Sequence, residues 1–100
     1  MIPREIQIQD YILNVLSEYY NIYPFSVYFT ESGETSPKIS ITFFGRDDLD
    51  DFLDILGYKK LCDKSGLYIL YDKSTVILSD MVKTILLDLL SKKVNKNEND

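Results

Sequence analysis

Two neighbouring stretches decide the fold: Phe25-Ser-Val-Tyr-Phe-Thr30 and Lys38-Ile-Ser-Ile-Thr-Phe43. In each stretch, large apolar side chains alternate with polar or tyrosyl ones, which is the period of a strand with one buried face. A polar segment that contains a glycine and a proline separates them. The sequence therefore predicts an antiparallel hairpin with one face in the core and one in water. The polar face consists of Ser26, Tyr28, Thr30, Ser40 and Thr42.

Three stretches with helical periodicity surround this hairpin. The first runs from about Pro3 to Tyr20, with the proline in the first turn, where its missing N–H is not needed. The second runs from about Arg46 to Leu56 and ends at a glycine, the residue type that most readily adopts the left-handed conformation after a helix. The third runs from residue 79 or 80 to residue 94. Each has one apolar side, so we expect all three to pack on the sheet.

A second hairpin is predicted from residues 58–62 and 67–72, joined by a turn that ends at Gly66. Residues 75–78 are a fifth short strand or the start of the last helix, because periodicity over four residues does not separate the two. The element order is then α-ββ-α-ββ(β)-α. It predicts a single α+β domain over residues 1–94, with an antiparallel sheet of four to five strands and three helices. Residues 95–100 contain no apolar side chain and are expected to be a frayed polar tail.

The expected core collects the apolar positions of these elements. Its members are Ile12, Val15, Leu16, Phe25, Val27, Phe29, Ile39, Ile41, Phe43, Leu49, Phe52, Leu53, Leu56, Ile69, Val82, Ile85, Leu86 and Leu89.

The composition excludes several kinds of chemistry. The chain has no histidine, so it has no imidazole base, no Ser-His or Cys-His pair and no histidine-containing zinc site. Its one cysteine, Cys62, allows no internal disulfide and is expected to be a small apolar residue. No run approaches the ~20 apolar residues that span a bilayer. We therefore expect a cytoplasmic protein that is not an enzyme, binds no metal or other cofactor, and does not associate with a membrane.

The net charge of −5 is unevenly distributed. Residues 46–54 contain one arginine and five aspartates, whereas residues 55–96 carry an excess of four positive charges. Helical spacing places the aspartates opposite the apolar side of the second helix. A solvated helix surface is the simplest interpretation, and a surface that binds a basic protein, by resembling a row of phosphates, is the functional one. The residues concerned are Asp47, Asp48, Asp50, Asp51 and Asp54.

Two further groups are candidates for binding. Lysine and tyrosine are mixed in the second half, as in some proteins that bind single-stranded nucleic acid; the members are Tyr58, Lys59, Lys60, Lys64, Tyr68, Tyr71 and Lys73. The first and last helices have more apolar surface than one sheet contact needs, which indicates either packing between helices or self-association. The candidate self-association residues are Tyr11, Leu13, Tyr20, Leu87, Leu90 and Val94.

These observations predict a non-catalytic protein-binding module, such as a phage, viral or mobile-element accessory protein that inhibits a host factor through its acidic helix. The expected partner is a protein with a basic surface, and a homodimer is a second expectation. If the protein is viral, it acts in the host cytoplasm. The net negative charge disfavours nucleic acid. The alternative is a binder of a small ligand or of single-stranded nucleic acid, using the polar sheet face or the Lys/Tyr-rich second half.

Overall fold

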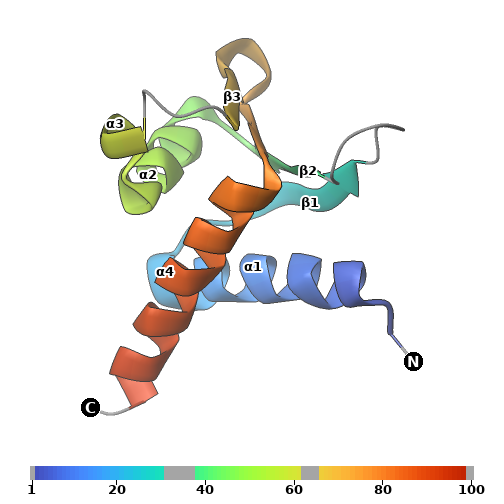
Figure 1. Cartoon of the computed structure of the whole chain (residues 1–100). Coiled ribbons are helices and arrows are strands. Elements are labelled where there is room, and N and C mark those ends of the chain that lie inside the picture. Colours follow the sequence, from blue (N-terminus) through green and yellow to red (C-terminus); the bar gives the residue numbers. More distant parts are fainter. Residues whose placement is uncertain (1, 31–37, 62–65, 99–100) are drawn as a thin grey trace.

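A four-stranded antiparallel sheet lies against three long helices in the computed structural model, which describes residues 2–30, 38–61 and 66–98 (Figure 1). The first half of the chain forms α1 (Arg4–Tyr20), β1 (Pro24–Thr30), β2 (Lys38–Phe43) and α2 (Arg46–Leu56). The second half forms the short helix α3 (Tyr58–Leu61), β3 (Leu67–Leu70), the 3₁₀ turn η1 (Tyr71–Lys73), β4 (Thr75–Leu78) and α4 (Asp80–Glu98). The order of strands and long helices confirms the α+β prediction.

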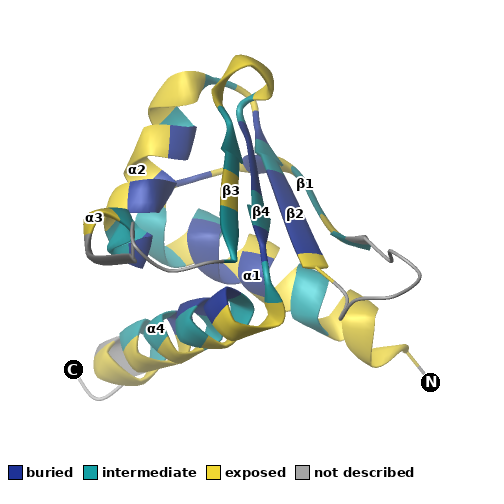
Figure 2. Ribbon diagram, turned by 45° about the horizontal axis from the view of Figure 1, so that its top comes forward, coloured by how far each residue is buried: buried dark blue, intermediate teal, exposed yellow. Residues whose placement is uncertain are grey.

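The strand order in the sheet is β1-β2-β4-β3, so the two hairpins meet along β2 and β4. Val27 lies opposite Ile41 in the first hairpin, and Ile41 lies opposite Val76 across the junction. α1 packs against β1, α4 against β2 and β4, and α2 against β2 and α4. No helix crosses the front of the sheet in Figure 2, where α1 passes behind the strands. One face of the sheet is therefore covered and the other is open.

The second hairpin is formed by β3 and β4, so the prediction that residues 58–62 pair with residues 67–72 is wrong. Gly57 ends α2 in the left-handed conformation, with φ 75°, and the chain turns directly into the short helix α3. Residues 75–78 form a strand because β2 and β3 both offer hydrogen-bonding partners to them. The single cysteine, Cys62, lies outside the described residues.

Most of the expected core is buried. The buried members are Ile12, Val15, Leu16, Ile39, Ile41, Phe43, Leu49, Phe52, Leu53, Leu56, Val82 and Leu86. Half-buried members that pack against them are Val27, Phe29, Ile69, Ile85 and Leu89. Four residues outside the expected set are also buried in the core: Ile22, Val76, Leu78 and Leu90.

Phe25 was expected in the core, but its side chain is 66% exposed, so this prediction is wrong. The register of β1 against β2 shifts between Pro24 and Ser26, which is a β-bulge. A bulge places two residues opposite one and breaks the alternation of side chains at that point. The side chain of Phe25 therefore does not point into the core as those of Val27 and Phe29 do.

The last helix is longer than expected. α4 continues to Glu98, so Asn95 and Lys96 are part of the helix, which was expected to end at Val94. A lysine in the last turn interacts favourably with the negative end of the helix dipole. Within the described residues, no helix combines the length and the apolar character needed to cross a membrane.

Candidate functional site

The aspartates of α2 lie on its exposed side, and the opposite, apolar side of the helix is buried. Leu49, Phe52, Leu53 and Leu56 are all buried, and the ring of Phe52 packs at 5.3 Å from that of Phe43 on β2. The other side carries all five candidate aspartates. Asp47, Asp50, Asp51 and Asp54 are exposed and Asp48 is half-buried. We call these five residues the acidic surface.

The acidic surface is almost unpaired within the described chain. Its one ion pair joins Arg46 Nε to Asp50 Oδ2 at 3.8 Å, and both side chains are more than half exposed. Such an exposed pair contributes little to stability. No ion pair connects the other four aspartates to any described residue, so their charge is available to a partner. The described residues contain no acidic or thiol cluster suited to a metal ion.

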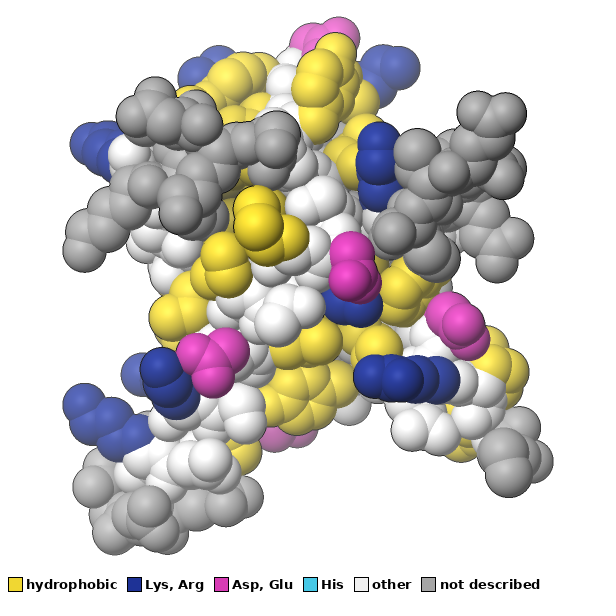
Figure 3. Space-filling view, in the orientation of Figure 1, with side chains coloured by type: hydrophobic (Ala, Val, Ile, Leu, Met, Phe, Trp, Pro, Cys, Tyr) yellow, Lys and Arg dark blue, Asp and Glu magenta, His cyan; other side chains and the backbone are white. Residues whose placement is uncertain are grey.

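The positive charges of the second half do not neutralise the acidic surface. On α4, Lys83 Nζ lies 2.6 Å from Asp80 Oδ1, and Lys92 Nζ lies 3.0 Å from Asp88 Oδ2. Both lysines therefore pair within their own helix. In Figure 3, acidic side chains in the middle and at the lower left of the view lie beside basic ones. The charge segregation in the sequence persists in the fold as a separate negative surface on α2.

Arg46 also connects the start of α2 to η1. Its guanidinium lies over the ring of Tyr71, 4.4 Å from the centroid. A side-chain hydrogen bond with Tyr58 raises the pKa of Tyr71, with smaller upward contributions from burial and from Asp50, while Arg46 acts in the opposite direction. Arg46, Tyr58 and Tyr71 thus lie together beside the first turn of α2.

The open face of the sheet is polar at its centre and aromatic at its edges. The register and side-chain alternation place two rows across it: Tyr28, Ser40, Ile77 and Tyr68 in one, and Ser26, Thr42, Thr75 and Leu70 in the other. Thr42 Oγ1 and Thr75 Oγ1 form a hydrogen bond of 2.9 Å across β2 and β4. A third outward row, at the other end of the first hairpin, places Lys38 opposite Thr30.

An exposed aromatic pair lies at the α2 end of the first hairpin. Phe25 and Phe44 are 66% and 72% exposed, and their rings meet edge to face at 5.3 Å and 89°. Sequence reasoning missed both residues. The adjacent Phe43 and Phe44 were a usable signal, because neighbours on a strand point to opposite faces and only one of them can enter the core. Phe44 is separated from the first residue of α2 by Gly45 alone.

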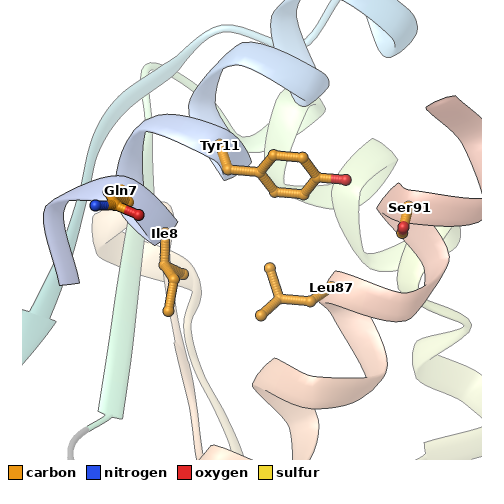
Figure 4. A pocket seen from close by; sticks show the side chains of 5 residues that line it. All are labelled: Gln7, Ile8, Tyr11, Leu87 and Ser91. Carbon is orange, nitrogen blue, oxygen red and sulfur yellow. The ribbon is translucent and has the colours of Figure 1, made fainter. Parts of the chain in front are cut away.

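Two of the candidate self-association residues, Tyr11 and Leu87, line a hollow between α1 and α4. The hollow has a volume of about 390 Å³ and is also lined by Gln7, Ile8 and Ser91. Ile8 and Leu87 point into the gap, and the ring of Tyr11 extends toward α4 on the side of Ser91 (Figure 4). None of the five side chains is charged.

The other self-association candidates are largely used within the chain. Leu90 is fully buried in the core, so it offers no surface to a second copy of the chain. Val94 is half-buried and packs against the core. Tyr20 is half-buried beneath the ammonium group of Lys93, which lies 5.3 Å from the ring centroid, and burial raises the pKa of Tyr20. Leu13 remains exposed. Packing between α1 and α4 therefore explains most of the extra apolar width of these helices.

The Lys/Tyr group does not form one surface among the described residues. Tyr58 and Tyr71 lie close together beside α2, whereas Tyr68 lies on the open face of the sheet. The side chains of Lys60 and Lys64 are outside the described part of the chain.

Comparisons with models of known protein families, with curated proteins and with solved structures find no match to this chain. The candidate function therefore rests on the chemistry and geometry of the surfaces described above.

Proposed function

We propose that the protein is a non-catalytic binding module that uses the acidic surface of α2 to bind a basic surface of another protein. One observation carries the proposal: four of the five aspartates have no ionic partner in the described chain, although the helix that bears them is fixed by a buried apolar side. A row of like charges on a rigid element attracts an oppositely charged partner and accelerates the encounter. If the partner is a host factor that binds nucleic acid or another anion, this contact inhibits it by competition.

A protein partner fits the surfaces better than a nucleic acid does. Binding of single-stranded nucleic acid needs cations along the path of the phosphates as well as aromatic side chains. The outward rows of the open sheet face contain Tyr28 and Tyr68, and their one cation, Lys38, lies at the end of β2 opposite Thr30. The nearby acidic surface would also repel phosphate groups.

The test compares two triple variants with the same change in net charge. In the first, Asp47→Lys, Asp51→Lys and Asp54→Lys reverse unpaired charges on α2. In the control, Glu5→Lys, Asp10→Lys and Glu18→Lys reverse exposed acids on α1. Asp47 and Glu5 each occupy the first turn of their helix, so both variants lose one favourable dipole interaction.

Affinity capture from an extract of the native host, followed by mass spectrometry, identifies proteins bound by the natural chain. We expect the control variant to retain the partner and the α2 variant to lose it. The captured partner, once purified, should bind more weakly when salt rises from 0.1 M to 1 M, since the screening length falls from about 10 Å to about 3 Å. Equal capture of the partner by both variants would show that the acidic surface does not bind it. Light scattering on the same samples measures whether the chain also forms a homodimer.

A further inference from the structure

The exposed pair of Phe25 and Phe44 suggests how the partner is held as well as attracted. Charge at the rim of an interface mainly sets the rate of encounter, whereas buried aromatic anchors near its centre supply most of the affinity. The acidic surface provides the first of these but has no exposed apolar side chain. The aromatic pair, whose Phe44 is separated from α2 by Gly45 alone, provides the second.

The geometry of the pair is suited to an anchor. The two rings meet edge to face at 5.3 Å, so each restricts the other before any partner arrives. Phe43, which precedes Phe44, is buried against Phe52 and fixes the backbone at this point. The phenylalanines therefore need little additional ordering on binding.

The surrounding charge limits what can cover the pair. A nucleic acid or an anionic membrane would bring negative charge next to Asp47 and Asp48 in the first turn of α2. A second copy docked symmetrically on the pair would bring two acidic surfaces together. A polypeptide with both large apolar and basic side chains meets neither objection, because it can bury the rings and pair with the aspartates.

We infer that Phe25 and Phe44 are the apolar anchor of the partner contact, and that the partner presents a large apolar side chain flanked by lysine or arginine. This inference rests on the proposed function, since the basic flank is the part that the acidic surface binds. It adds an apolar specificity that the acidic surface alone does not have.

The experiment uses a displayed library of random twelve-residue peptides, selected on the natural chain. Enriched peptides are synthesised and their dissociation constants are measured by calorimetry. The test variant carries Phe25→Ser and Phe44→Ser, which change only exposed side chains. The matched control is Met81→Ser, because Met81 is 50% exposed and lies beyond the opposite end of β4. The α2 triple charge reversal serves as the third protein.

We expect enriched peptides to combine Leu, Ile or an aromatic residue with Lys or Arg. The double phenylalanine variant should weaken their binding about tenfold to a hundredfold, while the Met81 variant leaves it unchanged. Basic peptides that bind the phenylalanine variant as tightly as the natural chain would overturn the anchor but leave the proposed function standing. Peptides that bind the α2 reversal variant unchanged would overturn the proposed function itself. A selection that enriches no peptide would count against both.

Discussion

Adjacent phenylalanines with opposite environments give the sharpest test of the sheet. Phe43 is 3% exposed and its ring contacts Phe52, whereas Phe44 is 72% exposed. Replacing Phe43 by Ala removes a buried ring and leaves a cavity, and such changes lower the free energy of unfolding by about 3–5 kcal/mol. Phe44→Ala removes mostly solvated surface and one exposed ring contact, so we expect a loss below about 1 kcal/mol.

Urea unfolding followed by far-ultraviolet circular dichroism measures both variants, with the slope against urea checked for constancy. For a domain of this size the Phe43 variant should also melt at least about 12 °C below the natural chain. If Phe43→Ala leaves no folded protein, Phe43→Leu keeps part of the volume and should cost about 1–2 kcal/mol. Losses that agree within about 1 kcal/mol at the two positions would contradict the assignment of opposite faces.

Three further predictions concern the second half of the chain. Gly66→Ala should destabilise the protein by about 1–3 kcal/mol, because Gly66 has φ 113° and a Cβ there would collide with the Ser79 side chain; thermal unfolding measures the loss. Tyr58→Phe should lower the pKa of Tyr71 toward its ordinary value of 10.0, since the hydrogen bond that raises it is lost; carbon-detected NMR titration of the tyrosine rings measures it. Because the folded-state pKa is the higher one, this bond stabilises the protein below pH 10.0 and its contribution disappears as the pH rises through the raised pKa. Thr75→Val should cost about 1–2 kcal/mol in urea unfolding, because the buried hydroxyl makes two hydrogen bonds of 2.9 Å.

Each of these has a matched control. Gly45→Ala should be tolerated, because its φ is −153° and no atom beyond its two chain neighbours lies within 4 Å of the added Cβ. The pKa of Tyr20, raised by burial on α1, should not respond to Tyr58→Phe. Thr84→Val removes an exposed hydroxyl bonded to a carbonyl of its own helix and should have little effect. A control that changes as much as its partner variant would contradict the corresponding structural reason.

The sequence was sufficient to predict an element where the residues of that element alone show which side is buried. The first hairpin and α2 have a buried and a solvated side, so periodicity identified them and placed the five aspartates outward. It was insufficient where the pattern depends on a distant neighbour. β4 pairs with β2 on one edge and with β3 on the other, and three of its four residues Thr75–Leu78 are buried, so the strand shows no clear polar-apolar alternation in sequence.

The aromatic pair shows a second reason why part of the structure could not be predicted from the sequence. The bulge at Phe25 is a local change of register that no residue type in the sequence indicates. Because of it, Phe25 is exposed although it was expected to be buried. Alternation with Phe43 indicates that Phe44 lies outside the core, but it does not indicate that Phe44 meets Phe25. The acidic part of the candidate site could therefore be predicted from residue types, whereas the apolar part required the paired strands.

The junction between β2 and β4 has a consequence for how the chain folds. Each hairpin joins strands that are close in sequence, but Thr42 and Thr75 are 33 positions apart. Closing that long segment, which includes α2, loses chain entropy before any of the junction contacts are gained. We therefore expect the two hairpins to form early and the encounter of β2 with β4 to limit the folding rate. Substitutions along this junction would then slow folding, whereas those in the edge strands would mainly accelerate unfolding.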